Sequence, residues 1–170
     1  ELRYLNAIKW LELKFGVSNP ICYQIYYEFS HFYFKIHSYL KSIEFTEICL
    51  GISKTAASLI DYAYDLNNLA SLYGLINNHD KELELLIKAK NICENNSLKE
   101  SKEYIDISGN LAMLFSLKNN LKDATFFIEE KMTQIKVMYD KSSIEYLNAE
   151  YDYANYFFIS GDKKKAELLI

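Results

Sequence analysis

Proline and glycine are scarce in this sequence: its 170 residues include one proline and five glycines. Hairpins and other tight turns draw heavily on both residues, so a sheet-rich domain with many turns is disfavoured. Half of the residues are apolar, and they recur at helical spacing, which is the primary signal for amphipathic helices. The sequence therefore predicts an all-α protein.

Cysteine is also rare. Cys22, Cys49 and Cys93 are far apart and show no Cys-x-x-Cys spacing. An odd number of cysteines with such spacing indicates neither a disulfide framework nor a zinc site. We expect three reduced, mostly buried thiols in a reducing compartment, and hence a cytoplasmic location.

Long apolar runs and a strong excess of one charge are missing as well. No apolar run approaches the roughly 18 residues that are needed to span a bilayer. The 19 basic and 23 acidic side chains leave a net charge of −4, which is not typical of a nucleic-acid binder. We therefore expect a soluble protein that binds neither a membrane nor, directly, a nucleic acid.

The sequence lacks the motifs that mark common catalytic, metal and phosphate sites. It contains no His-Glu-x-x-His, no glycine-rich phosphate loop and no Gly-x-Ser-x-Gly. The spacing of His31 and His37 places them on different helix faces, and His79 falls in an expected turn. We predict no enzymatic activity, no metal and no cofactor for this chain.

What the sequence does contain is an internal repeat. Ala70, Ala112 and Ala154 are equally spaced, and a fixed period of this length indicates a repeat architecture. A weaker copy, centred on Ser30, precedes them at nearly the same spacing. The neighbours of the alanine match in size across the copies. Leu69, Leu111 and Tyr153 directly precede it, Tyr73, Phe115 and Phe157 follow one turn later, and Glu82, Ala124 and Ala166 follow twelve residues later. The corresponding residues of the weaker copy are Phe29, Tyr33, Ser42 and Thr46.

The segment 66–73, Leu-Asn-Asn-Leu-Ala-Ser-Leu-Tyr, resembles the tetratricopeptide repeat (TPR). It is most similar to the long repeats of kinesin light chains and their bacterial relatives. The resemblance implies an all-α, right-handed superhelix of helix-turn-helix units. We expect residues 1–170 to be one solenoid segment of a longer protein, with the second helix of a partial repeat at 1–15 and repeats at about 21–52, 54–95, 98–139 and 143–170.

The joints between paired helices follow a regular pattern. One repeat position holds residues that tolerate positive φ and suit the residue just past a helix end. The next position holds good N-cap residues. The first set is His37, Asn77, Asn119 and Gly161, and the second is Ser38, Asn78, Asn120 and Asp162.

Other caps define the remaining helices. Gly16 is expected to end the first helix, and Asn19 to cap the next one with Pro20 at its first position. We expect Ser53 to cap a further helix, and capping boxes to begin at Ser97 and Ser142. The resulting first helices are 21–36, 54–76, 98–118 and 143–160, and the second helices are 39–50, 79–94 and 121–139.

The TPR resemblance also implies a binding surface, because the first helix of each pair lines the concave groove. Asn68 and Asn110 share the position at which peptide-binding members often carry an asparagine that reaches the ligand backbone. A side-chain amide both donates and accepts hydrogen bonds. The candidate peptide-binding residues are Tyr27, His31, Tyr64, Asn67, Asn68, Ser71, Asp106, Asn110, Met113, Asn148, Tyr151, Asp152 and Asn155.

One helix is surrounded by aromatic residues. A helix that is apolar all round is usually buried on all sides, so we favour a core role for this group, with Tyr27 and Phe34 as the alternative floor of a groove. The group comprises Tyr26, Tyr27, Phe29, Phe32, Tyr33 and Phe34.

Three functional hypotheses remain open at the level of sequence. The first is a binding module that holds a peptide or protein segment in the concave groove. The second is a sensor segment that controls an attached protease, DNA-binding or signalling domain in a bacterial protein. The third is an architectural spacer or a self-association surface.

Overall fold

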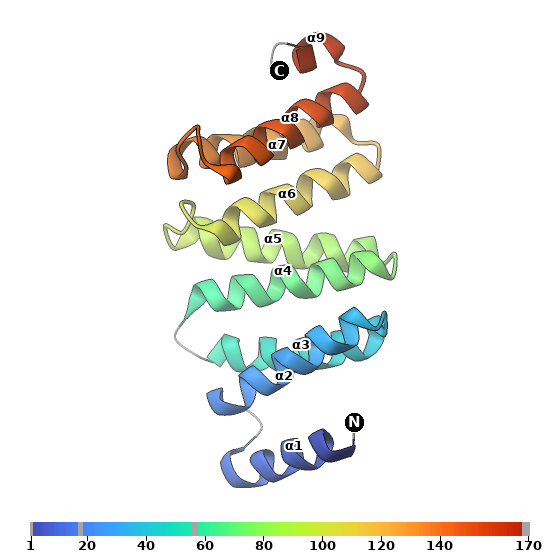
Figure 1. The fold of residues 1–170 in the computed structure, drawn as a ribbon, viewed down its shortest axis with the longest axis vertical. Helices are drawn as coiled ribbons and strands as arrows, with labels where there is room; N and C mark the ends of the chain where they lie inside the picture. The colour runs from blue at the N-terminus through green and yellow to red at the C-terminus, as the bar shows by residue number, and fades with distance from the viewer. Residues whose placement is uncertain (1, 17–18, 56–57, 168–170) are drawn as a thin grey trace. The chain divides into compact units, whose positions relative to one another are not determined.

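The computed structural model describes residues 2–16, 19–55 and 58–167, and this part of the chain is helical without strands. The helices follow one another along the chain and are joined by short connections (Figure 1). They confirm the predicted all-α class. Their bounds are α1 Leu2–Phe15, α2 Pro20–Lys35, α3 Tyr39–Thr55, α4 Leu59–Leu75, α5 His79–Asn95, α6 Lys102–Leu117, α7 Leu121–Met138, α8 Ile144–Ile159 and α9 Lys163–Glu167.

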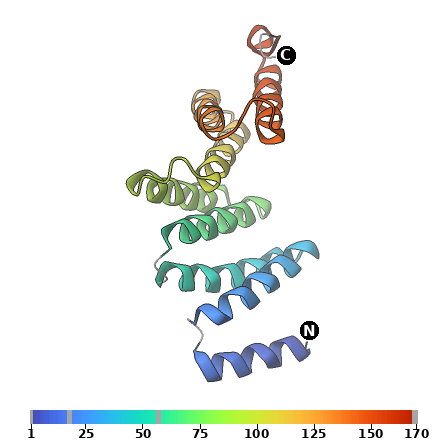
Figure 2. The ribbon, with the colours of Figure 1, turned by 60° about the vertical axis from the view of Figure 1, so that its left-hand side comes forward.

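The chain divides into two compact units, Glu1–Ile92 and Cys93–Ile170. Unit 1 contains α1 to α4 and most of α5, and unit 2 contains α6 to α9. Figure 2 shows the same helices turned by 60° and makes the pairing of α2 with α3 visible. No described helix is long and apolar enough to cross a membrane.

One core cluster of unit 1 lies where α1, α2 and α3 meet. Tyr26 is fully buried there, and its hydroxyl donates a hydrogen bond of 2.6 Å to Glu12 of α1. Phe45 of α3 stacks on Tyr26 and on Tyr33. The rest of this cluster includes Ile8, Cys22, Phe29, Cys49 and Ile52.

The small residues at the shared repeat position are buried, as the repeat predicts. Ala70 and Ala112 are buried, and so is Ala154. In the pair α2 and α3 the small residues are polar: Ser30 contacts Ser42 in a reciprocal pair of hydroxyl-to-carbonyl hydrogen bonds. Close approach of helix backbones requires such side chains.

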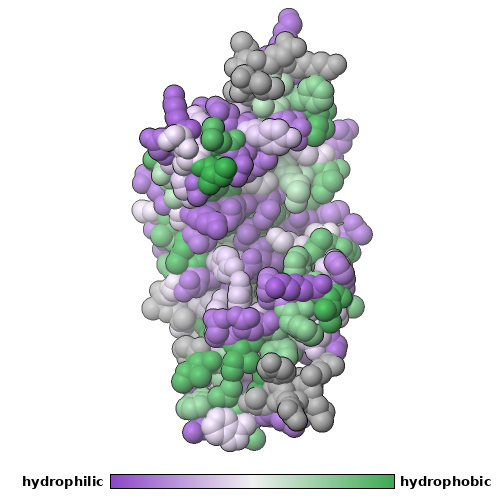
Figure 3. All heavy atoms as spheres, in the orientation of Figure 1, coloured by the Kyte–Doolittle hydropathy of each residue, from purple (hydrophilic) through white to green (hydrophobic). Residues whose placement is uncertain are grey.

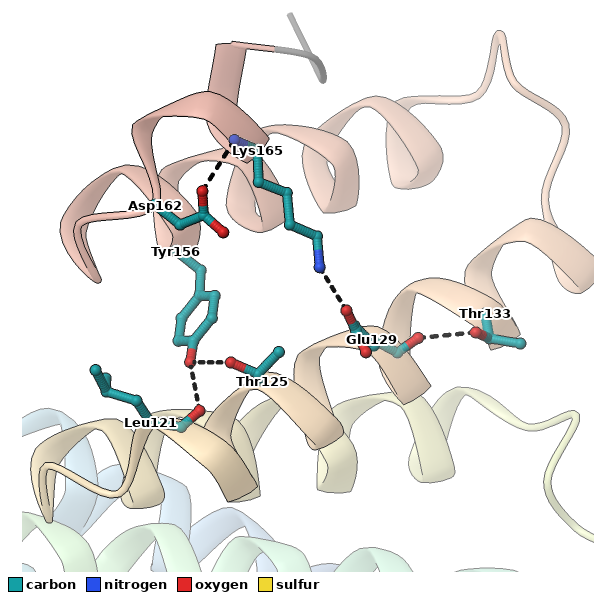
Figure 4. Close-up of polar contacts among 7 residues, drawn as sticks. All are labelled: Leu121, Thr125, Glu129, Thr133, Tyr156, Asp162 and Lys165. Atoms are coloured by element: carbon teal, nitrogen blue, oxygen red, sulfur yellow. Dashed lines mark hydrogen bonds and ion pairs between the residues drawn. The ribbon is translucent and has the colours of Figure 1, made fainter.

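In unit 2, polar contacts join α7 to α8 and α9 (Figure 4). Tyr156 of α8 donates a hydrogen bond to the carbonyl of Leu121, and its hydroxyl lies 2.9 Å from that of Thr125. Lys165 of α9 pairs with Glu129 of α7 at 2.6 Å. Three consecutive helices are thereby connected.

The predicted turn positions are confirmed, and so are four of the five caps predicted at the starts of α2, α3, α5, α7 and α9, Ser38 before α3 being the exception. The residues expected just past helix ends have positive φ: His37, Asn77 and Asn119 at 55° to 60° and Gly161 at 92°. Gly16, at 84°, ends α1 in the same way. The predicted caps Asn19, Asn78, Asn120 and Asp162 each accept a backbone N–H near the start of the following helix.

Three other predicted caps are wrong. Ser53 lies inside α3, buried, where its hydroxyl bonds back to the carbonyl of Leu50, and Ser58 caps α4 instead. Ser142 bonds to Asp140, and its neighbour Ser143 caps α8. A serine near a helix end can bond in any of these ways, so the sequence alone did not select one.

The third error concerns Ser97, which has φ 59° and ends α5, while Ser101 caps α6. Leu98 N–H bonds to the carbonyl of Cys93 at 2.8 Å. The same pattern of hydrogen bonds follows α2, α4 and α6, so Ser97 occupies the left-handed position of a Schellman-type helix end. Serine is an unusual residue there, which hid the helix end in the sequence.

The aromatic helix α2 is not buried on all sides. Tyr26, Phe29 and Tyr33 are in the core, but Phe32 is 52% exposed and Phe34 is 42% exposed. The predicted cysteine state is confirmed, since all three thiols are free and buried.

Replacing Ala112 by Leu should destabilise the protein by about 1–3 kcal/mol, because the larger side chain overpacks a buried helix contact. Chemical denaturation measures the change. Met113→Leu is the control, since Met113 is exposed on the same helix and should change stability by no more than about 0.5 kcal/mol. Equal stability of both variants and the wild type would show that Ala112 is not at a tight contact.

Replacing Ser97 by Gly should stabilise the protein by up to about 1 kcal/mol, because a left-handed backbone costs an ordinary residue roughly 1–2 kcal/mol and glycine very little. Thermal melting detects the increase. Ser97→Ala keeps the strained φ and should bring no gain. A glycine variant that melts no higher than the alanine variant would refute this assignment.

Candidate functional site

Unit 1 contains a pocket of about 300 Å³ between α2, α3 and α4. In Figure 3 the visible surface mixes hydrophilic and hydrophobic residues, with hydrophobic ones gathered at the α1 end. The pocket itself is mixed too, with aromatic, hydroxyl and amide side chains. It is lined by Tyr27, Ser30, His31 and Phe34 from α2, Ser42, Thr46 and Cys49 from α3, and Tyr64, Asp65, Asn68, Ser71 and Leu72 from α4.

The α3 side of the pocket is built from hydroxyl groups. The Ser30 hydroxyl lies 2.6 Å from that of Thr46 and 3.1 Å from that of Ser42. Thr46 in turn donates to the carbonyl of Ser42 at 2.9 Å. These groups satisfy one another, so they fix the crossing of α2 and α3 and give the pocket a rigid polar floor.

Asp65 is the one acidic residue among the described residues that line the pocket, and it is 1% exposed. Its Oδ1 accepts a hydrogen bond of 2.8 Å from the hydroxyl of Tyr23. Its Oδ2 is buried and has no hydrogen-bond partner in the described part of the chain. Burial raises the pKa of Asp65, while the nearby hydroxyls of Ser53 and Tyr23 lower it to a lesser extent.

Two tyrosines that line the pocket touch each other through their hydroxyls. The hydroxyls of Tyr27 on α2 and Tyr64 on α4 are 3.0 Å apart, and their ring centroids are 6.4 Å apart. Their hydrogen bond, followed by burial, raises the pKa of Tyr27 to about 12. Tyr23 stacks on Tyr27 from the preceding turn of α2. The pocket therefore has an aromatic wall, in which the tyrosine hydroxyls bond to each other.

The pocket holds no evident nucleophile among its described residues. Burial raises the pKa of Cys49 to about 12, with a smaller contribution from the Asp65 carboxylate, so this thiol stays protonated and is poorly reactive at neutral pH. Across the described parts of both units, no group of three His, Cys, Asp or Glu side chains could hold a metal ion.

Some of the residues predicted from the sequence meet in this pocket. They are Tyr27, His31, Tyr64, Asn68 and Ser71. Asn67, the sixth predicted residue of unit 1, does not line it: Asn67 is 8% exposed and lies on the buried face of α4.

The other predicted residues lie in unit 2. Asp106 and Asp152 are exposed there, and Asn110 is half-buried. Lys131 pairs with Asp152 at 3.3 Å. Desolvation raises the pKa of Asp106, while Lys102 and Lys131 lower it to a lesser extent. The remaining four, Met113, Asn148, Tyr151 and Asn155, are exposed on α6 and α8.

Asp65 was not among the predicted site residues, although a comparison of the repeat copies singles it out. The equivalent positions in the two later copies hold Ile107 and Ala149, and the position in the earlier copy holds Ile25. Ile107 and Ala149 are buried. A carboxylate at a position that is apolar in every other copy is unexpected and could have been singled out.

Solved structures of repeat proteins are similar to this chain. BtubC (BKLC) from P. vanneervenii superposes with a TM-score of 0.82 at 18% identity, over 98% of this chain and 66% of that chain. A Podosopora anserina protein described as a kinesin light chain with nearly identical TPR-like repeats gives a TM-score of 0.70 at 15% identity, over 98% of this chain and 83% of that chain. The fold is that of TPR-like repeats.

This likeness confirms the predicted TPR-type fold with kinesin-light-chain-like relatives in structure. The chain spans just under two thirds of the length of BtubC. No protein-family model matches the chain, and no curated protein matches it. TPR-like folds are in general protein-interaction scaffolds, and the fold by itself does not select a partner.

Replacing Asp65 by Asn should remove a pH dependence of stability. A carboxyl whose pKa is raised on folding stabilises the protein below its unfolded pKa of about 3.9, and this contribution is lost as the pH rises through the folded pKa. The stability of the variant relative to wild type should therefore increase with pH above about 4, by at most about 1.4 kcal/mol per pH unit. Denaturation at several pH values measures it, and a constant difference would refute the shift.

Proposed function

We propose that this chain is a protein-binding module and that the pocket of unit 1, with the surface around it, holds an extended peptide segment of a partner protein. The observation that carries the proposal is the pocket itself, which is open to solvent and lined by the first helices of two successive repeats, α2 and α4. The concave surface of a helical repeat protein is commonly its binding surface.

The chemistry of the pocket supports a peptide as the ligand. The half-buried Asn68 offers an amide that can donate to a carbonyl and accept from an N–H at once. The rings of Tyr27, Tyr64 and Phe34 offer apolar area beside it. Main-chain groups and side chains of an extended segment need this combination of contacts.

Filling the pocket should abolish binding. Short peptides are first selected from a random phage-displayed library on the whole chain, and their Kd is measured by fluorescence polarisation. Ser71→Trp should weaken the selected peptides by at least tenfold, because Ser71 is an exposed residue of the pocket lining.

The matched control is Met113→Trp, since Met113 occupies the same repeat position in unit 2 and is exposed. Met113→Trp should leave the Kd of the selected peptides within about twofold of the wild-type value. Failure to select any peptide, or equal effects of the two tryptophans, would refute the pocket as the binding site.

The amide has its own test. Asn68→Ala should weaken the same peptides by about 0.5–1.5 kcal/mol, the net value of a neutral hydrogen bond. The free energy of unfolding of the Asn68→Ala variant should differ from that of the wild type by no more than about 0.5 kcal/mol. Asn110→Ala is the matched control at the same repeat position in unit 2. Equal binding by the wild type and both variants would show that the amide does not contact the ligand.

A further inference from the structure

The buried carboxylate of Asp65 lacks the partners that such a group needs. An ionised carboxylate out of water is strongly destabilised unless it is paired with a cation or fully hydrogen-bonded. Tyr23 satisfies Oδ1, but Oδ2 has no hydrogen bond of ordinary geometry among the described residues. The Ser53 hydroxyl is close enough to favour the charge of Asp65, yet it donates its hydrogen bond to the carbonyl of Leu50. The group can be neutralised by a proton or by a cation that enters the pocket.

The described groups that face Asp65 supply no cation. Tyr23 contributes from α2, Cys49 and Ser53 from α3, and Asp61 from α4, and Asp61 adds a further negative charge. The described pocket lining contains no lysine or arginine, and its one basic side chain is that of the exposed His31. The electrostatic field inside the pocket is therefore suited to a positive charge.

The two acidic residues predicted as site residues in unit 2, Asp106 and Asp152, have a cation nearby. Lys131 pairs with Asp152 and acts favourably on the charge of Asp106. Those carboxylates have a cation supplied by the chain itself. Asp65 differs from Asp106 and Asp152 in three ways. It is buried, it lines a pocket, and one of its oxygens has no hydrogen bond of ordinary geometry among the described residues.

The walls of the pocket also favour a cation. The rings of Tyr27 and Tyr64 line it from two helices, and aromatic rings attract ammonium and guanidinium groups. Its volume of about 300 Å³ is at the lower limit for small-ligand sites. A single long side chain matches that size better than a whole cofactor does.

We propose that this pocket receives one basic side chain, lysine or arginine, of the bound peptide segment, with its charged end paired to Asp65 beside Tyr27 and Tyr64. This inference rests on the proposed function and adds the specificity of the site. The carboxylate of Asp65 then sets which segments bind, namely those with a basic residue at one defined position.

The test uses the peptides selected on the whole chain. Each lysine or arginine of a peptide is replaced in turn by norleucine, which retains an unbranched aliphatic chain and removes the charge. At one position this replacement should weaken binding to the wild type by at least tenfold, as expected for a charge-assisted contact. The same replacement should change binding to Asp65→Asn by less than twofold.

Glu84→Gln is the matched control, because Glu84 is exposed on α5, does not line the pocket, and its loss changes the net charge equally. It should behave as the wild type. Thermal melts verify that each variant is folded, and Asp65→Ala serves as a second variant if the asparagine disturbs the pocket.

The outcomes separate the two proposals. If norleucine peptides bind the wild type as tightly as the originals, or lose equal affinity on Asp65→Asn, the basic-residue specificity is refuted. Peptide binding that remains sensitive to Ser71→Trp would still support the proposed function. If no peptide is selected, or none is sensitive to Ser71→Trp, the proposed function fails and this inference fails with it.

Discussion

Close approach of paired helices is the constraint on which the rest of this structure depends. It is met by one small residue on the first helix of each pair, at Ser30, Ala70, Ala112 and Ala154, all of which are buried. Neighbouring aromatic residues then fill the space between helices, as Phe115 does against Phe127. A larger residue at the small position would separate the helices and disturb every contact that they make.

The first pair meets this constraint with polar residues, and the pocket follows from that choice. Ser30, Ser42 and Thr46 are small enough for the crossing of α2 and α3, and their hydroxyls satisfy one another. Alanine would pack as closely but would leave an apolar floor. In this unit a structural solution to helix packing also provides the polar surface of a binding site.

Asp65 shows how one residue can turn a repeat unit into a specific site. The other copies hold Ile25, Ile107 and Ala149 at this position, where an apolar side chain contributes to the core. A buried carboxylate reduces stability instead. Stability lost at a ligand-facing position is a common feature of binding sites, because the partner restores what the free protein lacks.

The sequence by itself determined the helical class, the repeat period, the small crossing residues and most helix ends. These features are local or periodic: a positive φ at Asn77 or a cap at Asn120 depends on the residue type and its immediate neighbours. Local bonding was also where the sequence misled, since Ser53 and Ser97 have several hydrogen-bonding options of similar energy.

Only the tertiary structure decided which residues meet. It placed Asn67 in the core and its neighbour Asn68 in the pocket, although both are polar and adjacent. It paired Lys131 with Asp152, which the sequence had suggested only as a peptide-binding residue. It left Asp65 buried without a cation among the described residues, because that outcome depends on what α2 and α3 bring to α4, and no local pattern records side chains from three helices at once.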